Sequence, residues 1–399
     1  MRAEITPSGR DGRPHGDMAL PVFRLEEYMA EWEFTARFNA TASDAETLTL
    51  DELLALASAE RLREWHTLPL GYRTTTGAPG LRAAIAATYE NVSPEQILTF
   101  VGAEEGIFCA MHALLGPGDH AVVLAPNYQS AEEVPRSICE TSAVALRWRE
   151  SGGWTLDLDE VDAACRPNTK LLAINFPNNP TGAMPPPGQH EELLRIAADR
   201  GLYVLSDEVY RGLERDGITP LPQAADLYAR ALSLGVMSKA YGLPGLRIGW
   251  IACRDAEVLR RMERMRHYLS ICSAGPSEML ATIALEAREV VLDRNRTIAR
   301  GNLEVLAGFF ARHERLFEWY VPPGSCVSYP RYLGADGVET FCRRAVRDSS
   351  VLLLPASIFQ SSLVTIPSDR FRIGFGRRNL REAVDALDAF IATDSAASV

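Results

Sequence analysis

Residues 238–249 read Ser238-Lys239-Ala240-Tyr241-Gly242-Leu243-Pro244-Gly245-Leu246-Arg247-Ile248-Gly249. An apolar run at 231–237 precedes them and predicts a buried β-strand, so Lys239 follows closely on a strand end. The glycines and the proline that come next predict a turn that leads to Arg247. A lysine at a strand end is ordinarily a surface residue. Lys239 nevertheless stands out, because the chain has only one other lysine, Lys170, against 39 arginines.

Short β-branched apolar runs on both sides of this segment alternate with helical patterns. The predicted strands are 120–125, 170–175, 202–207, 231–237 and 247–252. Strands that alternate with helices favour a mostly parallel sheet covered by helices on both faces. The sequence therefore predicts an α/β fold.

The second half of the chain adds longer helical patterns. Helices are predicted at 190–200, 277–310 and 379–393, and Pro322-Pro323-Gly324 interrupts the pattern between the last two. We expect an N-terminal arm at 1–44 that joins the small domain, a large domain at 45–290 and a smaller α+β domain at 291–399. The residues up to about 16 and those from 394 to 399 are expected to be loose ends.

Composition and charge limit the possible partners. The 399 residues are 47% apolar and carry a formal net charge of -11, which opposes binding to nucleic acid or to an anionic membrane surface. No stretch is apolar enough to span a membrane, and the polar first residues lack the core of a signal peptide, so we expect a cytoplasmic protein. The seven cysteines form no C-x-x-C pair, so neither a disulfide framework nor a metal site is predicted.

Three further segments have features that a lysine-anchored cofactor requires. Asn178-Asn179-Pro180-Thr181-Gly182 follows one predicted strand, and Ser206-Asp207-Glu208-Val209-Tyr210 spans the end of the next. Val101-Gly102-Ala103-Glu104-Glu105-Gly106 opens a helical run and could present backbone N–H groups to a phosphate. Taken singly, these segments are a turn, a helix N-cap and a glycine turn, and each is weak evidence.

Taken together and in this order, the four segments resemble the class I/II aminotransferases, a family of fold type I pyridoxal 5'-phosphate (PLP) enzymes. The resemblance runs from about residue 70 to residue 372, and its most specific part is the S-K-x-x-x-L-P-G-x-R-[IL]-G run at 238–249. It implies a large domain with a mostly parallel seven-stranded sheet between helices, a smaller α+β domain, and PLP as the cofactor. It also implies a small amino-acid substrate.

The resemblance assigns roles around the PLP ring. Lys239 matches the lysine that binds PLP covalently and then acts as general base. Asp207 matches the acid that keeps the pyridine nitrogen protonated. Asn179 and Tyr210 match the residues that donate hydrogen bonds to the phenolic oxygen of PLP. Asn179 is also expected to contribute to the substrate site. Tyr128 matches the aromatic residue on the ring face.

Further roles follow for the phosphate and the substrate. Ala103 and Glu104 at a helix N-terminus, together with Arg247 and Ser238, match the cofactor-binding residues of the phosphate end. Tyr72 resembles a tyrosine donated across a dimer interface to the same phosphate, which implies a homodimer with shared active sites. Arg372 matches the arginine that pairs with the substrate α-carboxylate.

Two positions depart from the family pattern. Val236 stands three residues before the lysine, where the family usually has a serine or glycine that contacts the phosphate. Glu104 would repel a phosphate unless its side chain turns away. Neither departure removes an essential catalytic group.

The reaction branch is the least determined part of the prediction. The whole chain looks most like enzymes of the capreomycidine synthase type, which dehydrate a β-hydroxylated arginine and close its guanidine onto the chain in actinomycete antibiotic biosynthesis. Asp44 is one candidate acid for the guanidinium group. The main alternative is an aminotransferase that passes its amino group to a 2-oxo acid, because it shares every residue named above.

Two other classes are disfavoured. A regulator built on the aminotransferase fold usually carries a helix-turn-helix domain, for which we expect no room here. An α/β domain that has lost PLP would not be expected to combine Lys239, Asp207, Asn179, Tyr210 and Arg247.

Overall fold

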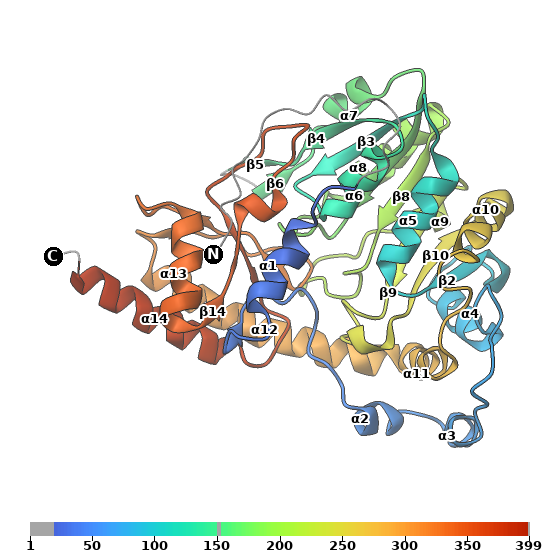
Figure 1. Ribbon diagram of the computed structural model, residues 1–399, viewed down its shortest axis with the longest axis horizontal. Coiled ribbons are helices and arrows are strands. Elements are labelled where there is room, and N and C mark those ends of the chain that lie inside the picture. Colours follow the sequence, from blue (N-terminus) through green and yellow to red (C-terminus); the bar gives the residue numbers. More distant parts are fainter. Residues whose placement is uncertain (1–19, 150–152, 398–399) are drawn as a thin grey trace, which may run out of the picture.

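The computed structural model describes residues 20–149 and 153–397, and the predictions for residues 1–16 lie outside this range. In the described part, seven strands form a central sheet in the order β2-β10-β9-β8-β7-β3-β4 (Figure 1). The strands are β2 (Ile97–Phe100), β3 (His120–Ala125), β4 (Glu140–Ala145), β7 (Thr169–Asn175), β8 (Tyr203–Asp207), β9 (Ala231–Val236) and β10 (Gly249–Cys253). Only β10 runs antiparallel to its neighbours, so the predicted mostly parallel sheet is confirmed.

Helices cover this sheet because its central strands are apolar on both faces. Helix α5 contacts both α6 and α10, and α8 contacts α9. The helices around the sheet are α2 (Leu50–Leu54), α3 (Ala59–His66), α4 (Pro79–Ala86), α5 (Ala103–Leu114), α6 (Gln129–Arg136), α7 (Leu158–Ala164), α8 (Pro187–Asp199), α9 (Ala224–Leu227), α10 (Ala256–Arg266) and α11 (Gly275–Glu286). Short 3-10 helices lie at Pro94–Gln96, Pro244–Leu246 and Ala356–Phe359.

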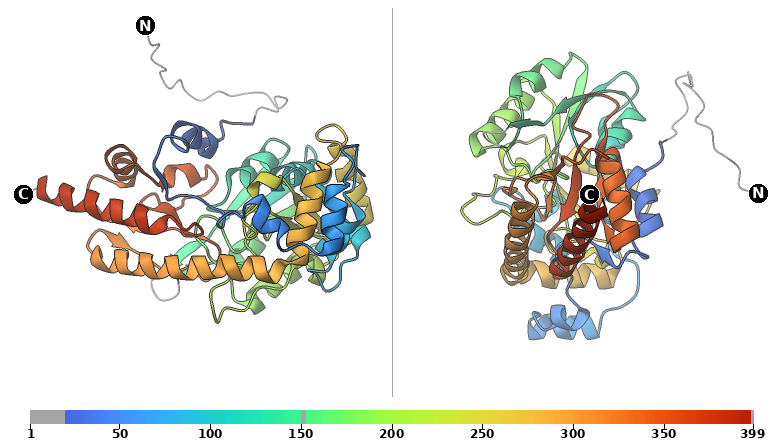
Figure 2. Two further views of the ribbon diagram at one scale, coloured as in Figure 1. Left: turned by 90° about the horizontal axis from the view of Figure 1, so that it is seen from below. Right: turned by 90° about the vertical axis from the view of Figure 1, so that its left-hand side faces the viewer.

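The C-terminal third mixes short strands with helices. Its helices are α12 (Arg288–Arg312), α13 (Val338–Ser349) and α14 (Leu380–Ala397), and its strands are β11 (Phe317–Glu318), β12 (Val327–Ser328), β13 (Arg331–Tyr332), β14 (Val351–Leu352), β15 (Leu354–Pro355) and β16 (Phe371–Gly374). Outside this third, β5 (Arg147–Arg149) pairs antiparallel with β6 (Gly153–Thr155). Helix α12 runs lengthwise alongside α14 and connects this part of the molecule to the side of the large sheet (Figure 2).

The N-terminal segment packs against the C-terminal third. Helix α1 (Arg24–Trp32) donates from Tyr28 Oη to the carbonyl of Leu353 at 3.2 Å, and β1 (Phe38–Asn39) pairs in parallel with β14. The domain limits at 44 and 290 stay predictions, and the second of them falls inside the continuous helix α12.

Several sequence-based boundaries were wrong. The predicted helix at 277–310 is two helices that meet at Ala287, and β2 and β4 were not predicted at all. The predicted strand at 247–252 begins only at Gly249, because Arg247 adopts a left-handed conformation with φ 50°. The expected loose end from 394 is helical to Ala397, since the alanine-rich segment favours helix and contains no helix breaker.

The described residues contain no helix that is both long and apolar enough to cross a membrane.

Candidate active site

The predicted site residues come together because parallel strands end at one edge of the sheet. Asp207 is the last residue of β8, and Lys239 lies three residues after the end of β9. Asn179 and Tyr128 follow β7 and β3, which run parallel to β8. Carboxyl ends of neighbouring parallel strands meet at the same edge, which is where ligands bind in such sheets. The spacing of four separate motifs along the chain thus becomes one cluster in space.

Lys239 is held in place by the N-terminal arm. Its Nζ donates to Ser43 Oγ at 2.8 Å, and its carbonyl oxygen accepts from the backbone N–H of Ala45 at 3.1 Å. Burial lowers the pKa of Lys239 below its ordinary value, and the neighbouring Asp44 carboxylate opposes this shift. A lysine with a lowered pKa is more often neutral, as a nucleophile or a general base must be.

Asp207 is partly buried at the carboxyl end of β8. Its Oδ1 accepts from the backbone N–H of Val209 at 3.2 Å. Burial raises the pKa of Asp207 to about 7, while Lys239 opposes the shift. A cation placed beside Asp207 would favour the ionised form again, so this carboxyl group fits the protonated ring nitrogen of PLP.

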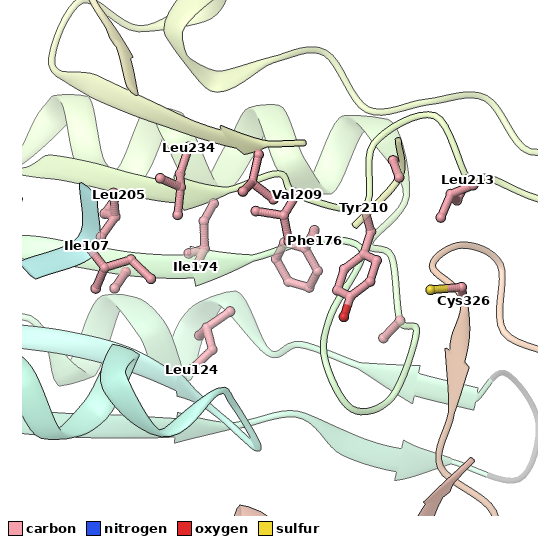
Figure 3. Packing of buried hydrophobic residues seen from close by; sticks show 14 of the residues in the cluster. Ile107, Leu124, Ile174, Phe176, Leu205, Val209, Tyr210, Leu213, Leu234 and Cys326 are labelled. Carbon is pink, nitrogen blue, oxygen red and sulfur yellow. The ribbon is translucent and has the colours of Figure 1, made fainter. Parts of the chain in front are cut away.

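Tyr210 supplies a buried hydroxyl group with no partner. The side chain is 1% exposed, and among the described residues its Oη has no hydrogen bond. Figure 3 shows its ring beside Phe176, with the hydroxyl directed away from the loop that carries it. Burial raises the pKa of Tyr210 well above its usual range, so the phenol remains a donor. A buried donor without a partner fits an acceptor supplied by a bound group.

Arg372 and Asn179 meet directly, although 193 residues separate them in the chain. Arg372 Nη1 donates to Asn179 Oδ1 at 3.0 Å, and Nη2 donates to the carbonyl of Thr41 at 2.8 Å. The guanidinium is 2% exposed, its Nε has no partner in the described residues, and burial lowers its pKa. Within the described part of the chain no carboxylate pairs with this buried guanidinium, which therefore fits a carboxylate supplied by a substrate.

The opposite end of the cluster is shaped by two glycines. Gly102 has φ 83° and precedes helix α5, and a Cβ at this position would lie 2.5 Å from Arg247 Nη2. A Cβ on Gly249 would lie 2.7 Å from the carbonyl carbon of Gly102. The close approach puts the Arg247 guanidinium over the N-terminus of α5, where Ala103 and Glu104 begin the helix. A helix N-terminus next to an arginine fits a phosphate group.

Glu104 does turn toward another group. Its Oε2 accepts from Ser130 Oγ on helix α6 at 3.1 Å, and burial raises the pKa of Glu104 to about 7. Tyr128 is half-buried, with its ring 5.3 Å from that of Phe23 and its Oη 3.5 Å from a carboxylate oxygen of Glu26. Burial and the nearby Glu104 raise the pKa of Tyr128. The hydrogen bond from Ser130 gives the Glu104 carboxyl group a partner within the chain.

Other predicted residues have different surroundings. Ser238 is half-buried, and Val236 is buried at the end of β9. Tyr72 is 91% exposed in the loop between α3 and α4, so the single chain does not bring it to the cluster. Asp44 is not free to hold a substrate guanidinium, because Arg377 donates to both of its carboxylate oxygens at 3.0 and 2.9 Å.

Sequence reasoning missed three groups that lie in the cluster. Thr41 and Ser43 contact Arg372 and Lys239 from the N-terminal arm, far from any motif. Cys326 is buried beside Lys239 and Arg372. Burial raises the pKa of its thiol to about 12, and the positive charges of Lys239 and Arg372 partly oppose this shift. No local sequence signal marks these residues, since each reaches the site only through tertiary packing.

Comparisons with known proteins show the family of this chain. The family model described as aminotransferase class I and II matches residues 39–387. Capreomycidine synthase of Streptomyces vinaceus is 32% identical over 384 residues, covering 95% of this chain and 96% of its own length. Among solved structures, a PLP-dependent aminotransferase from Streptococcus suis has a TM-score of 0.85 and 31% identity, covering 94% of this chain and 98% of that one.

A second structural neighbour is the PLP-dependent cyclase OrfR, with a TM-score of 0.85 and 25% identity, covering 96% of this chain and all of that one. These matches agree with the fold predicted from the four segments, and the family model spans most of the chain. The chain belongs to the class I and II aminotransferase family.

Proposed function

We propose that this PLP-dependent enzyme dehydrates and cyclises a β-hydroxylated arginine, forming a guanidine ring of the capreomycidine or streptolidine type in antibiotic biosynthesis. The observation that carries this choice is the similarity to capreomycidine synthase, which extends over 95% of the chain. The likeness to the PLP-dependent cyclase OrfR over 96% of the chain supports it further.

The buried groups of the site fit PLP. The ring nitrogen would lie against Asp207, the phenolic oxygen would accept from Tyr210 and Asn179, and the phosphate would lie between Arg247 and the start of α5. Tyr128 would cover the ring face, and Lys239 would hold the cofactor covalently. When bound, PLP supplies an electron sink that acidifies the α-carbon of the amino acid.

The protein groups would bind the substrate and move its protons. Arg372 would hold the α-carboxylate, which orients the Cα–H bond toward Lys239. Lys239 Nζ would take the Cα proton and then deliver a proton to the departing β-hydroxyl group, which leaves as water. A guanidine nitrogen would form the new bond to Cβ and lose a proton, and Cα would regain one, so the overall change is the loss of one water.

Transamination is the alternative, because an aminotransferase needs the same binding groups. The similarity to the PLP-dependent aminotransferase of Streptococcus suis favours this second candidate. The deciding experiment incubates the holoenzyme with β-hydroxyarginine alone and, separately, with common amino acids plus 2-oxoglutarate. A dehydrated cyclic product without an amino acceptor is expected, whereas glutamate formation without a cyclic product would make the protein an aminotransferase.

Arg372, which we propose binds the substrate α-carboxylate, gives one testable prediction. Arg372→Ala is expected to raise KM for the amino acid by about 10²-fold or more, since removing one partner of a buried charge pair costs about 2 to 5 kcal/mol. Steady-state kinetics measure this effect, and the absorbance of the bound cofactor should remain. Arg370→Ala is the matched control, because Arg370 is equally buried two residues earlier but stacks on Trp148 and Trp154. An unchanged KM in Arg372→Ala would reassign this residue.

A homodimer with shared active sites is part of the proposal. Two loops carry exposed apolar side chains. Leu70 and Tyr72 lie in one loop, and Tyr268, Leu269 and Ile271 lie in the other. Tyr268 is 89% exposed, and Ile271 has φ 65°, which is rare for a β-branched residue. Exposed apolar groups of this kind mark surfaces that another chain covers.

Subunit mixing tests whether Tyr72 acts across the interface. When inactive Tyr72→Ala and Lys239→Ala proteins exchange subunits at equal amounts, about a quarter of all sites should combine the native Lys239 and the native Tyr72 of the other subunit. Activity should therefore return on mixing. No recovery, with subunit exchange verified by differently tagged chains, would place Tyr72 outside the partner's site.

A further inference from the structure

A cavity of about 230 Å³ lies beside helix α12, outside the cluster around Lys239. Two loops close it, one that follows Tyr210 and one that precedes Cys326. Its apolar lining comes from Leu213, Ala299, Leu303, Pro322 and Phe375. An apolar cavity of about 150 Å³ in a protein can hold benzene, so this one has room for a single ring with a substituent.

Ser325 is the unusual residue in this lining. It is 1% exposed, and its hydroxyl group has no hydrogen-bond partner among the described residues. Its backbone has φ 75°, a left-handed conformation that residues other than glycine rarely adopt. An unpaired buried hydroxyl and a rare backbone conformation both cost free energy, and they persist together where a site is built for a ligand.

Four of the charged side chains at the rim, Arg296, Arg300, Asp216 and Glu214, have polar partners within the chain. Arg300 and Asp216 form a two-point ion pair at 2.7 and 2.9 Å, which joins α12 to the loop after Tyr210. Glu214 accepts from the backbone N–H of Gly212 at 2.9 Å, and Arg296 lies 3.8 Å from Asp293. Arg215 and Glu304 also line the cavity, but both side chains are exposed to solvent, so the buried polar group that faces a ligand is the Ser325 hydroxyl.

We propose that this cavity is a second small-molecule site, which takes a neutral, ring-sized apolar molecule with one hydroxyl or carbonyl group. The apolar lining binds the ring, and Ser325 Oγ exchanges a hydrogen bond with the polar group. This site depends on the fold and not on the reaction branch chosen above.

The cavity shares its loops with the active site. Figure 3 shows Tyr210 and Leu213 on one loop facing the strand that carries Cys326. Pro322 packs on the turn after Asn179, since a Cβ on Gly182 would lie 2.5 Å from the Cβ of Pro322. A molecule in the cavity therefore contacts the two loops that hold Tyr210 and Cys326, and its binding should stabilise both of them.

Phenol is the probe, and the holoenzyme is titrated with it by calorimetry and by thermal unfolding. We expect saturable binding and a raised Tm, with benzoate binding more weakly because its carboxylate would lose hydration against the apolar lining. Ser325→Ala should weaken phenol binding about tenfold while leaving benzene binding unchanged, since only phenol loses a hydrogen bond. Ala307→Trp places a large side chain at the cavity wall and should abolish binding of both probes.

Ala311→Trp is the matched control, because Ala311 is exposed one turn further along α12 and does not line the cavity. It should bind phenol like the unaltered chain. Phenol binding that survives both Ser325→Ala and Ala307→Trp, or the absence of any saturable binding, would overturn the proposal.

Discussion

Replacing Lys239 by alanine is expected to lower turnover by at least about 10³-fold, because in the proposed reaction this side chain would be both the covalent anchor and the proton carrier. The half-buried Nζ has Ser43 as its hydrogen-bond partner and a lowered pKa. Reduction of the holoenzyme with borohydride followed by peptide mapping should find the cofactor on Lys239. In Lys239→Ala the protein-linked absorbance should disappear while PLP still binds loosely.

The composition of the chain supplies a clean control for this experiment. Lys170 is the only other lysine. It is exposed and is the second residue of β7, whereas the candidate site lies at the carboxyl ends of the strands. Lys170→Ala should keep full turnover and full covalent attachment. Cofactor attached by reduction in the Lys239→Ala protein would have to be on Lys170 or the amino terminus, and that result would end the assignment.

Replacing Asp207 by asparagine is expected to lower turnover by roughly 10²- to 10³-fold, the usual cost of removing one preorganised electrostatic partner of a transition state. PLP should remain bound, because its phosphate and its covalent link do not depend on Asp207. Glu208→Gln is the matched control, since Glu208 is the adjacent buried acid but accepts from Ser233 Oγ and the backbone N–H of Ala224 instead. Near-normal turnover of Asp207→Asn would remove Asp207 from this role.

In the cofactor-free protein, the same substitution should change how the free energy of unfolding depends on pH. Burial raises the pKa of Asp207 to about 7, whereas an aspartate in an unfolded chain titrates near about 4. Between these values the folded chain holds a proton that the unfolded chain has lost, so this group makes stability fall as pH rises from about 4 to about 7. Asp207→Asn should remove about 1 to 3 kcal/mol of that decline, which denaturant unfolding at several pH values measures.

Binding of PLP should reverse this contribution. A protonated ring nitrogen beside Asp207 lowers the pKa of the carboxyl group, so the wild-type holoenzyme should show a smaller decline over the same pH range. An equal decline with and without PLP would mean that the ring nitrogen does not meet Asp207.

Local chemistry made much of the large sheet predictable. The predicted strands at 120–125, 170–175, 202–207 and 231–237 agree with β3, β7, β8 and β9 to within one residue at each end, because buried parallel strands are continuous apolar runs. The edge strand β4 is half exposed and mixed in character, so its pattern gave no such signal. The start of β10 was misplaced because the conformation of Arg247 is set by packing over Gly102 rather than by its own preference.

Local sequence patterns predicted the groups to which we assign the central chemistry, namely a lysine and an acid at neighbouring strand ends and a glycine turn before a helix, since each lies in a local motif with its own geometry. The surroundings of these groups became visible in the folded chain. Tertiary packing placed Thr41 and Ser43 against Arg372 and Lys239, paired Asp44 with Arg377, and left Ser325 unpartnered beside α12. Contacts between residues hundreds of positions apart depend on how the N-terminal arm and the C-terminal third pack on the sheet, and local sequence patterns do not encode that packing.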